Sequence, residues 1–247
     1  MAGSPLGSRV ILKLENLSKS FDSIRAIDAV DLEVAQGEAL GIIGPNGAGK
    51  TTLFNLVTGL LKPATGSIWF DGRDITRAPP RVRCIAGIGR SFQIPHPFEN
   101  LTVFENLLVA AIHGGRRREP QVVDTCGEIL ERTGLIGFAN RRAGMLNLLG
   151  RKRLELARAL ASAPRLLLLD EIAGGLSEAE CAELVELVQD IKKAGMTIVW
   201  VEHIVHVLVA VVSRLVVLNF GRKIVDGEPR SVMASDEVRE IYMGIAA

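Results

Sequence analysis

The sequence predicts an α/β fold with a largely parallel central sheet. Its 247 residues are 48% hydrophobic, which is enough to bury a substantial core in one large domain. Short β-branched or leucine-rich runs alternate with longer stretches of helical periodicity, and this alternation is typical of such folds. Strands that are covered on both faces have continuous apolar interiors. Four runs fit that description: residues 39–44, 166–170, 197–202 and 214–219.

Both ends of the chain depart from this pattern. Alternating residues and turn signals in WFDGRD and KIVDGEP predict antiparallel hairpins added to the main sheet. The middle of the chain is predicted to be mainly helical. Thr102 and Glu105 have the spacing of a capping box, and Gly134 falls where a helix from Val122 would end. Residues 113–120 are polar and rich in glycine, which predicts a mobile loop.

Composition argues against several classes of partner and location. A net charge of +1 and 4% aromatic residues provide neither a basic surface nor a stacking platform, so we expect no nucleic acid partner. Cys84, Cys126 and Cys181 lack metal-ligand spacing and are expected to pack in a reducing compartment. The first ten residues do not resemble a secretory signal. The most apolar region has only ten uncharged residues between His203 and Arg214, whereas a membrane span needs about 20. We therefore expect a soluble chain that meets a membrane through a partner.

One glycine-rich loop carries the clearest chemical signal. Gly44, Gly49, Lys50 and Thr51 fit G-x-x-x-x-G-K-[ST], between an apolar strand and a helix-forming run. Backbone N–H groups of such a loop wrap phosphates, the lysine reaches the β- and γ-phosphates, and the Thr51 hydroxyl can bind magnesium. The predicted nucleotide-binding residues are Gly44, Pro45, Asn46, Gly47, Ala48, Gly49, Lys50, Thr51 and Thr52.

A pair of acids closes the predicted strand 166–170. Asp170 at the carboxyl end of that strand can hold Mg²⁺ through water, and Glu171 can orient and deprotonate an attacking water molecule. An isolated acidic pair is more often a solvated strand end, but the glycine-rich loop favours the functional interpretation. The sequence thus predicts ATP and Mg²⁺ as ligands of a P-loop NTPase core.

Five segments in order, GPNGAGKTT, SFQ, RKRLELARAL, LLLLDE and VEH, resemble the ATPase subunit of an ATP-binding cassette (ABC) transporter over nearly the whole chain. The resemblance implies that Phe21 stacks on adenine, and that Gln93 touches magnesium and senses a membrane subunit. It also implies that His203 contacts the γ-phosphate. Structural alternatives exist: Phe21 could cover a hairpin, Gln93 could be a loop amide, and His203 could cap a helix.

The same resemblance gives a domain organisation. It implies that residues 1–247 would form one ABC ATPase domain, in which 1–90 and 161–247 would build the nucleotide-binding core with antiparallel additions. Residues 91–160 would form an inserted helical sub-domain that carries the signature loop of the family.

That signature is altered in this chain. The family usually has Leu-Ser-Gly-Gly-Gln, at the start of a helix aimed at the γ-phosphate bound by a second chain. Here Asn147 replaces the serine, Leu148 and Leu149 replace the glycines, and Gly150 replaces the glutamine. Asn147 can still donate a hydrogen bond. The side chain of Leu149 hinders close approach of the backbone, unless the loop shifts by one residue and Gly150 restores it.

Three cations, Arg151, Lys152 and Arg153, follow at the predicted helix start, where positive charge opposes the helix dipole. A docked anion would remove the conflict. The resemblance offers bound ATP or the acidic surface of a partner chain as that neighbour, and the alternative is three side chains in water.

The resemblance implies several partners. A second ABC ATPase chain, identical or different, would pack head to tail with this one. Transmembrane permease subunits would bind both chains at the cytoplasmic face of the inner membrane, and a solute-binding protein would act indirectly.

The subgroup is indicated by the run from Gly89 to Ala111, by Glu155 and by the ending Tyr242-Met243-Gly244, which resemble the ATPases of branched-chain amino-acid importers. Uptake driven by ATP hydrolysis is therefore expected. Two alternatives stay open: a nucleotide-binding regulatory subunit with impaired hydrolysis, and an ABC ATPase outside transport.

Two further positions depart from the family. Ile172 stands where proline is common, and Ser177 stands where a loop across the dimer interface usually has aspartate. Ser177 and Glu180 also have the spacing of a capping box, so a helix N-cap is an equally good interpretation of Ser177.

Overall fold

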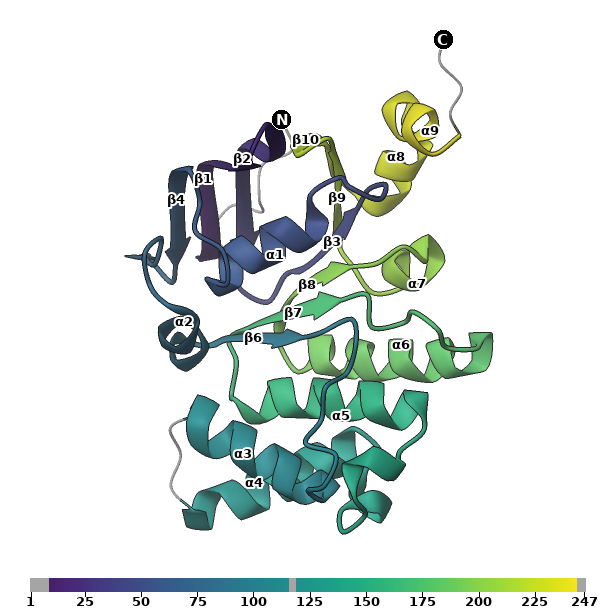
Figure 1. The fold of residues 1–247 in the computed structure, drawn as a ribbon. Coiled ribbons are helices and arrows are strands. Elements are labelled where there is room, and N and C mark those ends of the chain that lie inside the picture. Colours follow the sequence, from purple (N-terminus) through teal and green to yellow (C-terminus); the bar gives the residue numbers. More distant parts are fainter. Residues whose placement is uncertain (1–8, 116–118, 244–247) are drawn as a thin grey trace.

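The computed structural model describes residues 9–115 and 119–243 (Figure 1). A six-stranded sheet has the order β10-β9-β3-β8-β7-β6, in which β10 alone is antiparallel to its neighbour. Its strands are β3 (Ala39–Ile43), β6 (Ile88–Ser91), β7 (Leu166–Asp170), β8 (Thr197–Val201), β9 (Arg214–Asn219) and β10 (Arg222–Gly227). The four predicted central strands are confirmed as β3, β7, β8 and β9. The short parallel edge strand β6 is not evident in the sequence pattern, because it has only four residues, including Gly89 and Arg90.

A second, antiparallel sheet has the order β2-β1-β4-β5. Its strands are β1 (Val10–Phe21), β2 (Ile24–Ala35), β4 (Thr65–Phe70) and β5 (Arg73–Asp74). The turn Asp71–Gly72 joins β4 to β5 as predicted, with φ of +53° and +74°. The other predicted turn is wrong. β10 does form a hairpin with β9, but the hairpin turns at Phe220–Gly221, whereas Asp226–Gly227 ends β10 before a helix.

The helices are α1 (Lys50–Thr58), α2 (Pro80–Ala86), α3 (Val103–Gly115), α4 (Glu119–Arg132), α5 (Leu148–Ala161), α6 (Glu178–Lys193), α7 (Val205–Val209), α8 (Pro229–Ala234) and α9 (Asp236–Met243). Short 3₁₀ turns occupy Ile136–Phe138 and Ala143–Met145. Within the described ranges, no helix is both long enough and apolar enough to cross a membrane.

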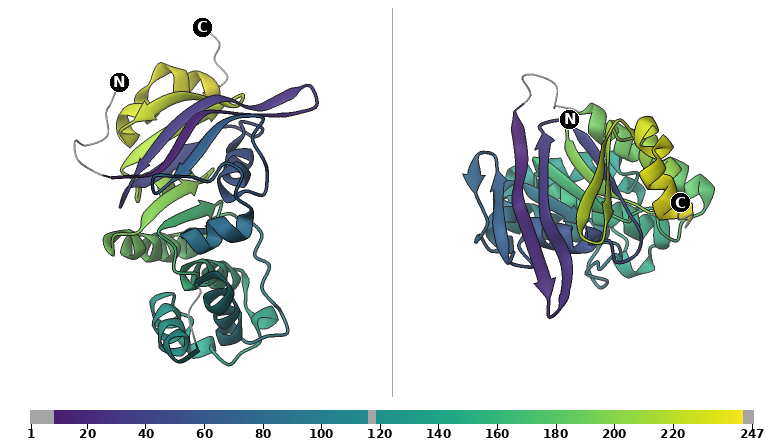
Figure 2. Two further views of the ribbon diagram at one scale, coloured as in Figure 1. Left: turned by 90° about the vertical axis from the view of Figure 1, so that its left-hand side faces the viewer. Right: turned by 90° about the horizontal axis from the view of Figure 1, so that it is seen from above.

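Alternate residues of the parallel strands enter two different cores, as expected for strands covered on both faces. On β7, Leu166 and Leu168 face a core shared with α1 and the antiparallel sheet, while Leu167 and Leu169 face α5 and α6. Figures 1 and 2 show the result: α1 lies between the two sheets, and α5 and α6 cover the opposite face of the six-stranded sheet.

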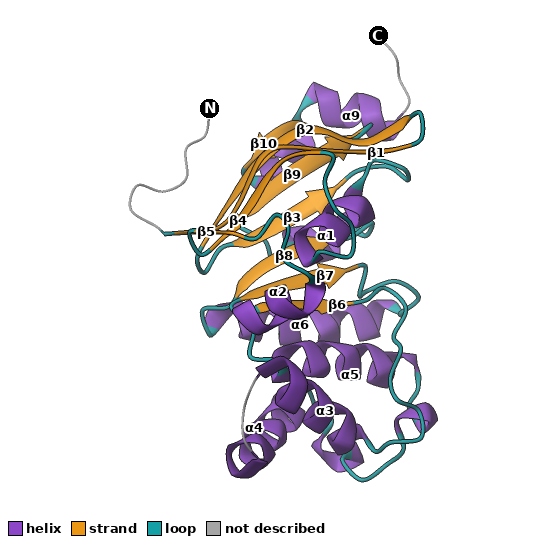
Figure 3. Ribbon diagram, turned by 60° about the vertical axis from the view of Figure 1, so that its left-hand side comes forward, coloured by secondary structure: helices purple, strands orange, loops and turns teal. Residues whose placement is uncertain are grey.

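A third core lies in the helical layer formed by α3, α4 and α5 (Figure 3). Helix α5 serves both sides, because Leu156 and Leu160 pack on the sheet while Leu154 and Ala157 pack on α3 and α4. The predicted helix signals are confirmed. Thr102 and Glu105 cap α3 reciprocally, and α4 ends just before Gly134, which has φ +68°. The predicted loop 113–120 is wrong at both ends, because residues 113–115 belong to α3 and residues 119–120 to α4. Its residues 116–118 lie outside the described residues, as does Gly244 of the ending Tyr242-Met243-Gly244.

Candidate functional site

The loops after four adjacent parallel strands carry most of the predicted site residues. β3 leads into the glycine-rich loop 44–49, β8 into Glu202 and His203, β7 into Glu171, and β6 toward Gln93. Because these strands are parallel and lie in the order β3-β8-β7-β6, their carboxyl ends meet at one edge of the sheet. This edge is where open α/β sheets bind ligands.

The glycine-rich loop approaches its neighbours too closely for side chains at two positions. A Cβ atom on Gly44 would lie 2.2 Å from the Leu218 carbonyl oxygen, and one on Gly49 would lie 2.4 Å from the Ala26 carbonyl oxygen. Gly49 also has φ +102°. Asn46, Gly47 and Thr51 are exposed, Pro45 and Thr52 are partly exposed, and Ala48 is buried.

Lys50 begins α1 and lies under this loop, with 5% of its surface exposed. Its Nζ donates to the carbonyl oxygens of Gly44 at 2.7 Å and Pro45 at 3.0 Å. Burial lowers the pKa of Lys50, and the nearby carboxylates of Glu171 and Asp170 oppose that change. The lysine is therefore held at the centre of the loop and close to both acids.

Asp170 forms a buried ion pair that the sequence did not predict. Its Oδ2 accepts from Nη2 of Arg90 at 2.6 Å, and the two side chains are 5% and 7% exposed. Arg90 also donates to Oδ1 of Asn55 at 2.7 Å, and its guanidinium stacks on the rings of Phe54 and Phe92. Oδ1 of Asp170 is buried and has no hydrogen-bond partner within the described structure. That oxygen retains its lone pairs for a ligand.

The carboxylate of Glu171 lies between two other predicted residues. Nε2 of His203 is 2.7 Å from Oε1 of Glu171, and Nε2 of Gln93 donates to Oε2. Glu171 has φ +47°, which is strained for a residue with a side chain and is common at functional sites. The fold thus assembles Glu171, Gln93 and His203, and their roles toward a nucleotide stay predictions.

The buried Glu202 hydrogen-bonds main-chain segments next to this cluster. It is 1% exposed, its Oε1 accepts from the backbone N–H of Ala173 at 2.7 Å, and its Oε2 accepts from that of His203 at 3.2 Å. Burial raises the pKa of Glu202, and these hydrogen bonds counter the rise. One carboxyl group therefore joins the segment after Glu171 to the segment that begins at His203.

Phe21 ends β1 at the tip of the β1–β2 hairpin, and 43% of its surface is exposed. Leu17 and Ile27 fill the apolar side of the hairpin and are fully buried. Phe21 is therefore not needed to cover that side. Nζ of Lys19 lies 5.3 Å from the centroid of the Phe21 ring. Adenine stacking remains a prediction for this ring.

Helix α5 begins at the altered signature, with Asn147 as its N-cap. Oδ1 of Asn147 accepts from the backbone N–H of Gly150 at 2.9 Å, and a Cβ on Gly150 would lie 3.0 Å from that oxygen. Glycine at position 150 therefore suits the capped turn. Leu149 is 9% exposed and Leu148 is 42% exposed. These contacts are internal to the chain, and contact of Asn147 or Gly150 with a nucleotide is untested.

The cations at the start of α5 do not share one surface. Arg153 pairs with Glu183 on α6, and Arg151 donates to two backbone carbonyls of the preceding loop. Lys152 is 3% exposed, and its Nζ donates to the carbonyl oxygen of Gln93 at 2.7 Å. The alternative that places these cations in water is wrong for Lys152, because its side chain turns inward, while proximity to bound ATP or to a partner's acidic surface stays a prediction.

Two departures after Glu171 have structural explanations. Ile172 is 1% exposed and packs in the core between the sheet, α5 and α6. Ser177 caps α6 in a reciprocal capping box with Glu180, which confirms the N-cap interpretation.

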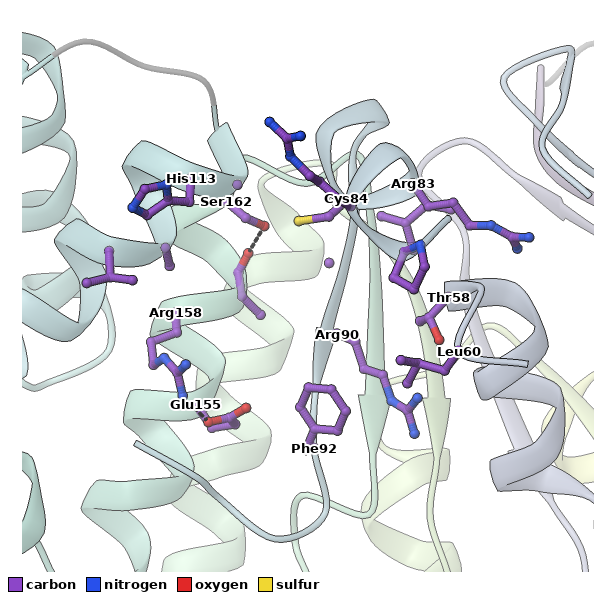
Figure 4. Close-up of a pocket in the computed structure, with 18 of the residues that line it drawn as sticks. Thr58, Leu60, Arg83, Cys84, Arg90, Phe92, His113, Glu155, Arg158 and Ser162 are labelled. Carbon is purple, nitrogen blue, oxygen red and sulfur yellow. Dashed lines mark hydrogen bonds and ion pairs between the residues drawn. The ribbon is translucent and has the colours of Figure 1, made fainter. Parts of the chain in front are cut away.

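A pocket of about 390 Å³ opens between α2, α3, α5 and β6 (Figure 4). Leu60, Phe92 and Phe98 line it and are about half exposed, at 53%, 43% and 48%. Arg158 and the buried Glu155 form an ion pair in its wall, with Nη1 of Arg158 2.9 Å from Oε2 of Glu155. The pocket adjoins Gln93, because Phe92 immediately precedes it.

Sequence reasoning missed Arg90, Glu202 and the inward orientation of Lys152. A glutamate that ends an apolar run just before His203 was a usable signal for Glu202. No sequence signal identifies Arg90 or Lys152, because each is one of several cations in its segment and only packing distinguishes it from the others.

Comparison with known proteins identifies the family. A family model described as ABC transporter matches residues 27–174. The high-affinity branched-chain amino acid transport ATP-binding protein BraF of Pseudomonas aeruginosa is 34% identical, over 97% of this chain and 100% of that protein. LivG of Salmonella typhimurium, which has the same description, is 35% identical over the same shares.

Solved structures agree with the fold. The ADP conformation of MJ1267, an ATP-binding cassette of an ABC transporter, has a TM-score of 0.88 at 33% identity and covers 96% of this chain and 100% of that one. A dimeric post-hydrolysis state of the cassette MJ0796 bound to ADP and Pi has a TM-score of 0.80 at 27% identity, over 89% and 99%. The chain therefore belongs to the ABC transporter family, whose ATP-binding cassettes it matches over almost its whole length.

Proposed function

We propose that this chain is the ATP-binding and ATP-hydrolysing subunit of an importer, and that it powers uptake of branched-chain amino acids through partner membrane subunits. The observation that carries the proposal is the carboxylate of Glu171, held between Gln93 and His203 at the sheet edge that also carries the glycine-rich loop. The substrate class comes from the names of the relatives.

Each residue has a task in this proposal. The amides of loop 44–49 and the ammonium of Lys50 bind the phosphates, and Lys50 exchanges its backbone carbonyl partners for the β- and γ-phosphates. Phe21 stacks on adenine. Glu171 takes a proton from the attacking water, and His203 orients the γ-phosphate.

The donor set fits Mg²⁺. Its preferred ligands are oxygens, and the buried Oδ1 of Asp170 lacks a partner within the described residues. Asp170, Thr51 and Gln93 would hold the ion, which when bound would neutralise charge on the β- and γ-phosphates. Arg90 pairs with Oδ2 of Asp170 and does not occupy this second oxygen.

In this proposal the transporter also contains a second ABC ATPase chain and transmembrane permease subunits, and this chain lies at the cytoplasmic face of the membrane. The pocket beside Gln93 suits a permease segment, because it offers half-exposed apolar side chains next to a residue that touches Glu171. ATP-driven closure of the two chains would move the helical layer and the docked segments together.

The altered signature favours an unequal pair. We propose that the site built on this chain's own glycine-rich loop turns over efficiently, while a partner's site closed by α5 is slower. Leu149 replaces a glycine, and the Oδ1 of Asn147 is engaged by Gly150. Leu149→Gly in the assembled pair should raise turnover or nucleotide affinity at the second site, and no change in either would contradict the proposal.

The primary experiment is ATP turnover with Glu171→Gln. ATP binding should persist while turnover falls by about 10²- to 10⁴-fold, the usual contribution of a general base. Glu186→Gln is the matched control, because Glu186 is exposed on α6. Near-normal turnover of the Glu171 variant would remove Glu171 from this role.

Turnover per chain across a wide range of protein concentration tests the partner. A rise with concentration would mean that two copies complete each other's sites. Binding without turnover would point to a different ATPase chain or to the permease.

A further inference from the structure

A buried lysine outside the roles above lies behind the Glu171 cluster. Lys152, on the first turns of α5, is 3% exposed. Its Nζ donates to the carbonyl oxygen of Gln93 at 2.7 Å and, over a longer distance of 3.3 Å, to that of Glu171. One ammonium group therefore binds the main chain of both residues whose side chains meet in the candidate site.

Burying an ammonium group is costly unless partners compensate. Burial lowers the pKa of Lys152, and four carboxylates oppose that effect, first Glu202 and then Glu171, Asp170 and Glu155. The hydrogen bonds nevertheless go to backbone carbonyls and not to these acids. The carboxylate of Glu171 thus stays available to Gln93 and His203 while its main chain is held.

Helix α5 also holds the loop after β6 at other points. The backbone of Phe92 hydrogen-bonds Glu155, and Nη1 of Arg158 donates to the carbonyl oxygen of His96 at 2.9 Å. With Lys152, these side chains recur every three residues and so lie along one helix face. Of the three, Lys152 is the one for which a contact with Glu171 is described.

We infer that Lys152 is a positioning residue for ATP hydrolysis, which fixes the backbones of Gln93 and Glu171 from the helix that begins at the signature. Glu171 needs such support because its φ of +47° is strained. A movement of α5 would be transmitted through this side chain to the main chain of Glu171, the residue that carries the catalytic carboxylate. The inference rests on the proposed function.

The test compares Lys152→Met, Lys152→Arg and Lys192→Met in the full chain, assembled with its partners where turnover requires them. Lys192 is the matched control, because its Nζ also donates to a backbone carbonyl, that of Val211 at 2.6 Å, but on α6 away from the cluster. The measurements are kcat and KM for ATP, the melting temperature, and amide hydrogen exchange of segments 91–95 and 170–175 without nucleotide.

We expect Lys152→Met to lower kcat by about 10- to 100-fold, the size of effect that follows a displacement of about 1 Å at a reacting group. KM should change by less than about threefold, because ground-state binding of ATP does not use this contact. Lys152→Arg should recover much of kcat. Exchange in both segments should accelerate in the Met variant and stay normal in the Lys192 variant.

Three results would overturn the inference: unchanged exchange in both segments, unchanged kcat in an active assembly, or a loss that the Lys192 variant shares through a lower melting temperature. A wild-type protein that binds no ATP would instead refute the proposed function. The exchange measurement would still decide whether Lys152 holds the two segments.

Discussion

Replacing Arg90 by Met should destabilise this chain far more than loss of a typical arginine. The guanidinium is 7% exposed, pairs with Asp170 at 2.6 Å, and stacks on two phenylalanine rings at 5.7 Å and 4.8 Å. The other oxygen of Asp170 has no partner in the described structure, so the variant leaves a buried carboxylate with none. Breaking a buried pair from one side costs about 3–5 kcal/mol, and lost stacking adds about 0.5–2 kcal/mol.

Equilibrium urea unfolding without nucleotide measures this loss. Arg165→Met is a matched control, since Arg165 pairs with Asp71 at 2.5 Å and lies 6.0 Å from the ring of Phe70, but is 40% exposed. It should cost less than about 1 kcal/mol. In an Asp170→Asn background the Arg90 substitution should lose much of its effect. A loss below about 1 kcal/mol, or an equal loss in both backgrounds, would refute the reasoning.

Phe21→Ala should weaken ATP binding by about 1–3 kcal/mol, because it removes the half-exposed ring predicted to stack on adenine; unchanged affinity in calorimetric titration would exclude that role. Asn147→Ala should lower the free energy of unfolding, measured in urea, by about 1 kcal/mol, because the backbone N–H of Gly150 loses its cap. Ser177→Ala, which removes the side-chain N-cap of α6, is the variant for comparison. Glu155→Gln should gain stability relative to the wild type as pH rises above 4.5, the ordinary pKa of the group. Burial raises the pKa of Glu155 in the folded chain, which then keeps a proton that the unfolded chain releases, so the wild type loses stability with rising pH; parallel stability curves would contradict this.

Short sequence patterns predict several local features of this protein correctly. The glycine-rich loop, the acids at positions 170 and 171 and the capping boxes at Thr102 and Ser177 are short patterns whose geometry depends on neighbouring residues. The four central strands were equally evident, because a strand buried on both faces must be apolar throughout. The hairpin turn after β9 is not distinguished in this way, since the residue types at both Phe220–Gly221 and Asp226–Gly227 are compatible with a turn, and the chain turns at the first pair.

Long-range packing brings together polar side chains that no local pattern connects. Gln93, Glu171 and His203 are far apart in the chain and meet because the strands that precede them are neighbours in one parallel sheet. Arg90 and Lys152 were indistinguishable from other cations until packing turned one toward Asp170 and the other toward two backbone carbonyls. The energy of a charge depends on its burial and its partners, and both arise from contacts between residues distant in sequence, so local patterns do not predict them.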